Sequence, residues 1–184
     1  MKQHTLKIEI LDHWHIGSGV GLAGYIDSLS LKDERGLPFI PGRSIKGLLR
    51  ECLRSAEDFG HAPQGTTDRL FGAMAGGDTG STPGSIHLGN ACLDQKIADW
   101  LAHPDHNKLE LAQLFTVIGA TALKDGVARD ESLRLIELVV PMTLFCTITC
   151  PEDDLKWIKL AAPLLRGVGA HRNRGLGRCI TTLQ

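Results

Sequence analysis

Glycine and arginine alternate in one short stretch near the end of the chain, residues 167–178. Four glycines stand there among three arginines, a histidine and an asparagine. Glycine lets backbone N–H groups approach a phosphate closely, and arginine adds a bidentate positive charge. A plain surface turn needs one or two glycines and no arginines, so the stretch predicts phosphate binding. The polar side chains concerned are His171, Arg172, Asn173, Arg174 and Arg178.

A second basic cluster surrounds a predicted helix start. After Pro41 and Gly42, apolar residues recur every three or four positions, which predicts an amphipathic helix over residues 44–57 with Ser44 as its N-cap. A helix start presents unpaired N–H groups and the positive end of the helix dipole, so it can hold an anion. The alternative is an ordinary amphipathic helix with a solvated basic face. The residues expected to contact a phosphate here are Arg43, Ser44, Lys46 and Arg50.

The elements that must position these side chains follow an α+β order. Residues 5–11 alternate between apolar and polar, which predicts a half-buried strand ahead of the first helix. Further strands are predicted at residues 85–93, 144–150 and 178–183, and Pro151 opens a second helix. This is the β-α-β-β-α-β plan of the ferredoxin-like fold, whose open sheet face is a common platform for RNA. Outside this core we expect an extended stretch at 25–31, an irregular insertion at 60–83 and a hairpin within about 114–140 whose polar tip is 124–132.

Composition limits the classes of function. The chain has 184 residues, enough for one domain with a proper core, and a net charge of −1, so any contact with nucleic acid must come from local clusters. Its five cysteines form no C-x-x-C pair, which argues for a reducing cytosol and against a disulfide framework or a zinc knuckle. Pro104 disrupts the possible ligand pair His103 and His106, so no metal site is predicted from the sequence. We recognise no signal peptide and no apolar run of spanning length, and therefore expect a cytoplasmic protein without a membrane partner.

Several of these stretches together resemble the RAMP superfamily, the repeat-associated proteins of CRISPR systems. Residues 37–50, Leu-Pro-Phe-Ile-Pro-Gly-Arg-Ser-Ile-Lys-Gly-Leu-Leu-Arg, resemble the helix start of that family. Residues 174–178, Arg-Gly-Leu-Gly-Arg, resemble its glycine-rich loop. Shorter likenesses lie at residues 15–19, 70–72, 86–91 and 137–145. The likeness spans nearly the whole chain and is greatest to the repeating backbone subunit of type III effector complexes.

The resemblance implies a single RAMP domain over residues 1–184 that stacks with copies of itself and with other CRISPR effector subunits. It implies that a guide (CRISPR) RNA lies along the two basic clusters and pairs with a complementary target RNA. The hairpin within residues 114–140 would then be the thumb that interrupts the guide–target duplex. The residues implied to hold the guide RNA are Arg43, Ser44, Lys46, Arg50, His171, Arg172, Asn173 and Arg174.

The resemblance also implies one catalytic residue, Asp27. Family members use an aspartate in this register, with a divalent metal such as Mg²⁺, to cut target RNA by attack of the neighbouring ribose 2′-hydroxyl. A lone carboxylate can hold the ion or orient the hydroxyl; alternatively, Asp27 only forms hydrogen bonds within its own loop. The chain is short for this group, and Gly119 and Ala120 stand near the thumb base where the family often has a basic residue. The alternative is therefore a non-catalytic RNA-binding assembly subunit.

Three other functions stay open at this point. RAMP endoribonucleases that process guide RNA use histidine acid–base chemistry, and His13, His15 and His171 lie in or beside glycine-rich loops. Those enzymes usually carry two ferredoxin-like halves, which this length hardly allows. A purely structural subunit would use its arginines for packing alone. A small-molecule phosphate enzyme would need one deep pocket, and residues 167–178 lack the Gly-Lys-Ser/Thr of a Walker loop.

Overall fold

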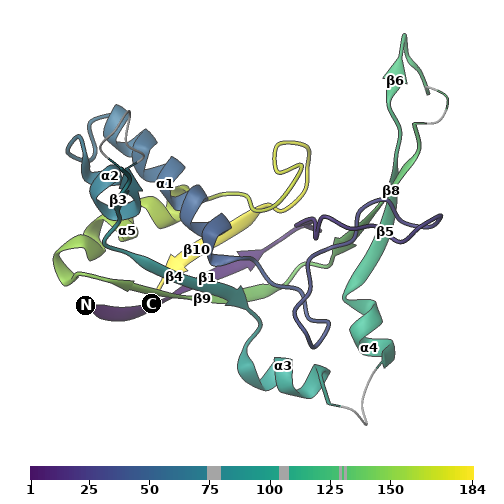
Figure 1. Ribbon diagram of the computed structural model, residues 1–184, viewed down its shortest axis with the longest axis horizontal. Helices are drawn as coiled ribbons and strands as arrows, with labels where there is room; N and C mark the ends of the chain where they lie inside the picture. The colour runs from purple at the N-terminus through teal and green to yellow at the C-terminus, as the bar shows by residue number, and fades with distance from the viewer. Residues whose placement is uncertain (74–79, 104–107, 129, 131) are drawn as a thin grey trace.

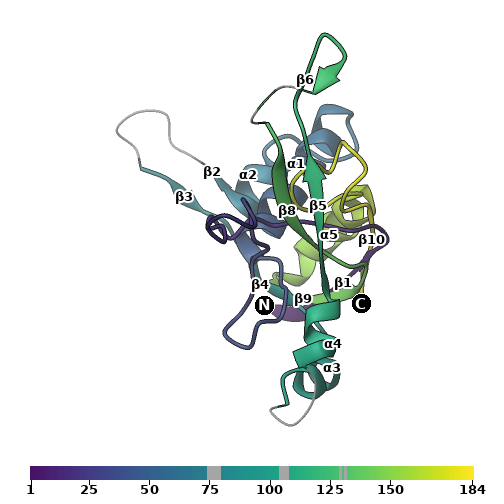
Figure 2. The same ribbon diagram turned by 90° about the vertical axis from the view of Figure 1, so that its right-hand side faces the viewer.

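The computed structural model describes residues 1–73, 80–103, 108–128, 130 and 132–184. At its centre, four strands form an antiparallel sheet in the order β10-β1-β9-β4. With α1 and α5 on one face of this sheet, the order along the chain is β-α-β-β-α-β, which confirms the ferredoxin-like fold (Figures 1 and 2). These core elements are β1 (Lys2–Ile10), α1 (Gly42–Asp58), β4 (His87–Cys92), β9 (Thr143–Cys150), α5 (Leu155–Ala161) and β10 (Cys179–Leu183).

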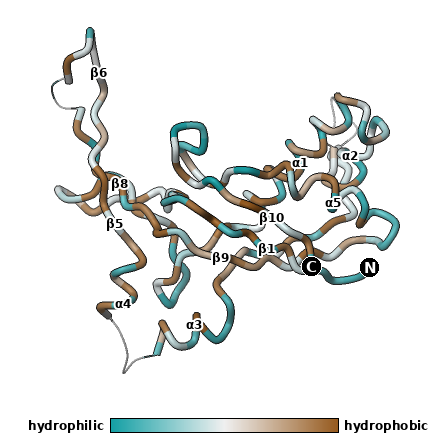
Figure 3. The backbone as a smooth tube through the Cα atoms, turned by 180° about the vertical axis from the view of Figure 1, so that it is seen from behind, coloured by the Kyte–Doolittle hydropathy of each residue, from teal (hydrophilic) through white to brown (hydrophobic). Residues whose placement is uncertain are grey.

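The hydrophobic core fills the space between the sheet and the two helices. Leu6, Ile8 and Ile10 of β1 are buried, because alternate residues of a strand point to the same face. The apolar stripe predicted for the first helix is confirmed, and its buried members are Ile45, Leu49, Leu53 and Ala56. Figure 3 shows hydrophobic residues along the sheet and α1, whereas the loop of residues 167–178 is largely hydrophilic. Residues 170–175 of that loop therefore lie in solvent, whereas Val168 is buried in the core.

Helix α1 begins at Gly42, and its N-cap is Pro41, which makes no side-chain capping bond. The prediction of Ser44 as N-cap was wrong. The reason is tertiary: Oδ1 of Asn90, on β4, accepts a hydrogen bond from the Gly42 N–H at 3.0 Å and so caps the helix from the neighbouring strand. Gly42 packs so closely on β4 that an added Cβ would lie 2.6 Å from the carbonyl oxygens of Leu88 and Gly89.

Two glycines of α1 form a matched pair for testing this contact. Gly42→Ala is expected to destabilise the protein by about 1–3 kcal/mol, because its methyl group would overlap backbone atoms of β4 that cannot move aside. Gly47→Ala should be neutral or stabilising by up to about 1 kcal/mol, since nothing lies within 4 Å of its Cβ and alanine favours a helix. Unfolding in urea measures both; equal midpoints would contradict the close packing.

A β-hairpin projects from the sheet and forms the thumb-like part of the molecule (Figure 1). Its base pairs β5 (Phe115–Ala120) with β8 (Arg134–Val139), and its outer part pairs β6 (Leu123–Lys124) with β7 (Val127–Ala128). The predicted hairpin is confirmed. Its tip turns at Asp125 and Gly126, both with positive φ. Positions 129 and 131 of the predicted tip lie outside the described residues.

The remaining elements lie around this core. The insertion expected to be irregular contains a short helix, α2, and a two-residue pairing of β2 with β3, which corrects that prediction. The stretch 25–31 forms only isolated bridges, so the expected extended segment is not a regular strand. Two short helices, α3 and α4, connect the sheet to the thumb, and two 3₁₀ turns flank α5. The bounds are α2 (Thr66–Phe71), β2 (Gly72–Ala73), β3 (Thr82–Pro83), α3 (Gln95–Leu101), α4 (Lys108–Gln113), η1 (Glu152–Asp154) and η2 (Ala162–Leu164).

Within the described part of the chain, no helix has both the length and the apolar composition that a membrane span requires.

Candidate nucleic-acid interface

The loop of residues 167–178 lies between α1 and the thumb (Figure 1). Gly169 and Gly177 have positive φ, and a Cβ on either would overlap a backbone carbonyl, of His15 and Val168 respectively. Only glycine can occupy these two positions. His171 also has a positive φ of 58°, and its carbonyl accepts a bond from Arg174 N–H at 2.7 Å, which closes a turn at the tip. The polar side chains at residues 171–174 are all exposed.

Ion pairs occupy two of the predicted RNA-binding arginines, Arg50 and Arg172, and also the neighbouring Arg54. Arg50 and Arg54 both contact Oδ1 of Asp68, at 3.2 Å and 2.9 Å, and Arg172 contacts Glu51 at 3.0 Å. Such surface pairs are worth about 0–1 kcal/mol, so a phosphate can replace the carboxylate. The Arg172–Glu51 pair also ties the loop to α1.

Other predicted cations are not paired in this way. Within the described residues, Arg43, Lys46 and Arg174 have no acidic partner. Arg43 and Arg174 are exposed, and Lys46 is partly exposed. These three side chains are therefore available to a polyanion without first breaking an ion pair.

The helix start contributes less than the sequence predicted. Among its first four N–H groups, that of Gly42 donates to Asn90, and those of Ser44 and Ile45 donate to the carbonyl of Pro41 at 2.9 Å and 3.3 Å. The predicted anion site made of unpaired backbone groups is thus largely closed. Charge near this helix end comes from the side chains of Arg43 and Lys46.

Asp27, the predicted catalytic residue, is exposed and lies beside the base of the thumb. Its Oδ2 accepts a bond from Leu135 N–H at 2.7 Å, and its own N–H donates to Leu135 O at 2.9 Å. One carboxylate oxygen thus fixes the loop, as the alternative interpretation of Asp27 expected, while Oδ1 has no described partner. The described residues contain no group of three His, Cys, Asp or Glu side chains that could hold a metal. A Mg²⁺ ion here would therefore have Asp27 as its protein ligand and would depend on RNA phosphates and water for the rest, which Mg²⁺ tolerates.

His15 does not have the environment of a general acid or base. The side chain is buried, and its Nδ1 donates to Glu137 O at 2.7 Å while Nε2 accepts from Ser28 Oγ at 3.1 Å. Burial lowers the pKa of His15 below 6.5, so the ring is neutral. The structure therefore corrects the expectation that His15 could carry acid–base chemistry; His13 and His171 are exposed.

The sequence model of the RAMP superfamily matches residues 7–180. The chain belongs to the RAMP superfamily. No curated protein sequence matches the chain significantly. Similar folds occur in the type III-B Cmr-β complex bound to cognate target RNA (TM-score 0.70, 12% identity, covering 100% of this chain and 97% of the other). The apo state of type III-B Cmr-β gives a TM-score of 0.67 at 14% identity, covering 98% and 96%. A chain of a type IV-B CRISPR complex gives 0.66 at 14% identity, covering 100% and 90%.

This RAMP protein has a basic residue at the thumb base that the sequence analysis missed. Arg134 pairs across the hairpin with Ala120, so a positive charge lies on the strand opposite Gly119 and Ala120. Arg134 lines one depression together with His171 and Arg174 of the glycine-rich loop. Arg134 is the first residue of β8. The register of the two hairpin strands, had it been predicted, would have placed Arg134 opposite Ala120.

Strand β8 separates two sides of this interface. Leu133 and Leu135 line the depression that holds Asp27, whereas Arg134 and Ile136 line the depression at the glycine-rich loop. Because side chains alternate along an extended chain, the thumb base presents an apolar side to Asp27 and a basic side to the loop.

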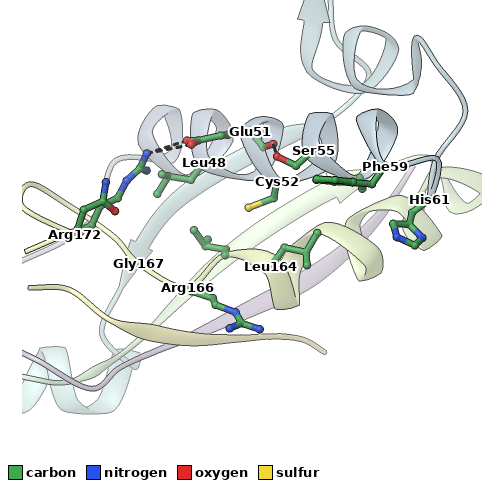
Figure 4. Close-up of a pocket in the computed structure, with 13 residues that line it drawn as sticks. Leu48, Glu51, Cys52, Ser55, Phe59, His61, Leu164, Arg166, Gly167 and Arg172 are labelled. Atoms are coloured by element: carbon green, nitrogen blue, oxygen red, sulfur yellow. Dashed lines mark hydrogen bonds and ion pairs between the residues drawn. The ribbon is translucent and has the colours of Figure 1, made fainter. Parts of the chain in front are cut away.

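The RAMP domain also has a groove between α1 and the segment that leads into the glycine-rich loop (Figure 4). Its lining is largely apolar and includes the exposed side chains of Phe59 and Leu164. The Glu51–Arg172 ion pair lies at one end and His61 at the other. The groove thus places its carboxylate, Glu51, and its histidine, His61, at opposite ends rather than side by side.

The RAMP protein is expected to lose stability on acidification through His15. Its neutral ring is favoured in the folded state, so as the pH falls through 6.5 the unfolded chain takes up a proton first. The contribution is therefore present above that pH and is lost below it. Urea unfolding at pH 7.5 and pH 5.5 measures the effect. The His15→Gln variant should have a lower free energy of unfolding than the wild type at pH 7.5, but that free energy should fall less between pH 7.5 and pH 5.5. An equal fall in both proteins would contradict the assignment of this pH dependence to His15.

Proposed function

We propose that this RAMP protein is a backbone subunit of a type III CRISPR effector ribonucleoprotein in the cytoplasm. It binds guide RNA along the phosphates and cleaves complementary target RNA in a divalent-metal-dependent reaction. Its partners are copies of itself and other effector subunits. The likeness to CRISPR complexes supports the fold, and the family assignment supports the class of protein.

The observation that carries the proposal is a set of basic side chains on three adjoining elements, α1, the glycine-rich loop and the thumb. The Arg172–Glu51 pair joins the glycine-rich loop to α1, where Lys46 and Arg43 lie, and Arg174 and Arg134 line one depression between the loop and the thumb. A chain of net charge −1 gathers these cations on adjoining elements. These side chains, the RNA path, suit a polyanion that runs over several elements better than a small phosphate ester. The open sheet face is less suited to RNA, because it has few aromatic side chains to stack on bases.

Cleavage is assigned to Asp27. In the proposed step, a ribose 2′-hydroxyl gives its proton to water and its oxygen attacks the adjacent phosphorus. The bond from phosphorus to the 5′-oxygen breaks, and that oxygen takes up a proton from water. The products are a 2′,3′-cyclic phosphate and a 5′-hydroxyl. Asp27, held by Leu135, orients the hydroxyl or holds the cation through Oδ1. A bound divalent ion would stabilise negative charge on the phosphate oxygens.

The second candidate is a non-catalytic RNA-binding subunit. It is favoured by one observation: Oδ2 of Asp27 is already engaged by Leu135, and the described residues contain no group of three His, Cys, Asp or Glu side chains that could hold a metal. This candidate shares the guide-binding path and differs only in the fate of the target RNA.

A double substitution tests the RNA path. Lys46→Ala with Arg174→Ala should weaken binding of single-stranded RNA to the purified protein about tenfold, irrespective of sequence. Two lost phosphate contacts should also reduce the slope of log affinity against log salt by about 1.4. Arg50 is left in place because it is paired with Asp68.

The matched control for this test is Lys96→Ala with Lys159→Ala. These exposed lysines lie on α3 and α5, away from the path, and the change in net charge is the same. The measurement is RNA binding at several salt concentrations. Equal affinities and slopes for the two double variants would exclude the proposed path.

A further inference from the structure

Three segments of the chain meet at one buried side chain, that of His15. Its ring contacts Ser28 Oγ at 3.1 Å, Ser30 Oγ at 3.2 Å and Glu137 O at 2.7 Å. Ser28 and Ser30 belong to the segment after Asp27, and Glu137 belongs to β8 of the thumb. His15 is 5% exposed, so these bonds are shielded from water.

The backbone of His15 supports the glycine-rich loop. Its carbonyl oxygen accepts a hydrogen bond from Ala170 N–H at 2.8 Å. Gly169 lies so close to the same oxygen that any Cβ there would overlap it. A second bond, from Gly177 N–H to His13 O at 2.8 Å, holds the other limb of the loop. A displacement of the loop therefore acts directly on residues 13–15.

On its other side, His15 is linked to the segment that carries Asp27. Ser28 N–H donates to Leu135 O at 3.3 Å, and the Ser28 carbonyl accepts from Glu137 N–H at 2.9 Å. Ser30 N–H donates to Oε2 of Glu137 at 2.9 Å. Together with the two bonds between Asp27 and Leu135, these contacts tie residues 27–30 to the thumb strand. Ser28, next to Asp27, is thus held by both the strand and His15.

We propose that His15 is a positioning residue that couples the glycine-rich loop to Asp27. RNA seated on residues 167–178 fixes the loop, the loop fixes His15 through its carbonyl, and the imidazole ring fixes Ser28 and with it Asp27. The inference rests on the proposed function for what the loop binds and what Asp27 does. It adds that guide RNA on the loop further restrains the cleavage carboxylate, which Leu135 already holds in the absence of RNA.

Two glycines of the loop provide a matched test. Gly169 and Gly175 have similar positive φ values, 79° and 88°, so alanine brings similar backbone strain at each. Only the Cβ at Gly169 meets His15, whereas nothing lies within 4 Å of the Cβ at Gly175. Hydrogen–deuterium exchange of a peptide covering residues 26–30 gives the readout, with and without guide RNA. Guide RNA should slow this exchange about tenfold in the wild type but not in Gly169→Ala, and Gly175→Ala serves as the control for backbone strain in the RNA-free state.

Ser28→Ala tests the link on the other side of His15. It removes the hydroxyl that the ring accepts from and leaves the loop unchanged. RNA affinity should stay within about twofold of the wild type, while target cleavage and the guide-dependent protection of residues 26–30 should each fall about tenfold. Protection that persists in both Ser28→Ala and Gly169→Ala would overturn the coupling, since a merely structural histidine would not transmit occupancy of the loop.

The RNA-free proteins separate this inference from the proposed function. If no RNA binds, the proposed function fails, but the contact can still be tested by exchange of residues 26–30 in the free proteins. Gly169→Ala should exchange about tenfold faster there than Gly175→Ala. Equal rates would overturn the coupling through His15 whatever the protein binds.

Discussion

Asp27→Ala is expected to abolish metal-dependent cleavage of complementary RNA by the guide-loaded complex, with a loss of about 10²–10⁴-fold in the single-turnover rate. Target binding should change by less than about twofold, because base pairing with the guide provides most of it. The physical reason is that Asp27 is the exposed carboxylate beside the thumb base that has an oxygen free for a ribose hydroxyl or a cation. The measurement is cleavage of a labelled target with Mg²⁺ and with chelator.

Asp27→Asn separates chemistry from loop geometry in the same assay. An asparagine keeps an oxygen that can accept from Leu135 N–H, so the loop should stay in place while the negative charge is lost. Both variants should be inactive if the charge matters. If the Asp27→Asn variant cut normally and the Asp27→Ala variant did not, Asp27 would only shape the loop. A wild-type complex that binds its target and leaves it uncut would instead establish the non-catalytic subunit.

Glu137→Ala is expected to destabilise the protein by about 2 kcal/mol, or about 4–8 °C in Tm. Glu137 is buried at the base of the thumb, where Oε1 contacts Lys32 Nζ at 2.9 Å and Oε2 accepts from Ser30 N–H. Lys32 in turn lies 3.9 Å from the centre of the Phe115 ring, a cation–π contact with the other thumb strand. Truncation leaves a partly buried ammonium without its carboxylate. The value is below that for a fully buried pair because the Lys32 side chain is 32% exposed.

The matched control for Glu137 is a surface ion pair on the sheet. Lys7 and Glu9 lie 3.1 Å apart on β1, and both side chains are partly exposed to solvent. Glu9→Ala should therefore change the free energy of unfolding by less than about 1 kcal/mol. Thermal unfolding of the two variants compares them directly. Equal shifts in Tm would mean that the partly buried Glu137–Lys32 pair contributes no more to stability than the surface pair.

Local patterns in the sequence predicted the regular elements well. The alternation in β1 and the three-and-four spacing in α1 depend on residues a few positions apart, so each could be read without knowledge of the fold. The hairpin also followed from two apolar runs around a polar tip. Helix α2 was missed because its neighbourhood is rich in small and polar residues, and it is anchored by a distant contact: Arg69 pairs with the buried Asp154 at 2.7 Å.

In the candidate site, too, some features can be predicted from the sequence and others depend on the folded arrangement. The sequence shows directly which residue types gather at the start of α1 and in the glycine-rich loop. Charge and chain flexibility are properties of the residues themselves. Three other features follow from the folded arrangement: Arg134 joins the basic residues, Asn90 closes the helix start, and His15 is buried.

The contacts responsible for these features join residues far apart in the chain. His15 and Glu137 are separated by 122 positions, and Asp27 and Leu135 by 108. A histidine beside a glycine-rich loop, such as His15, looks equally suited to catalysis and to structure until packing removes it from water. The burial and the hydrogen-bond partners of such a residue depend on which strands and loops pack together. Local residue spacing does not predict contacts between segments so far apart in the chain.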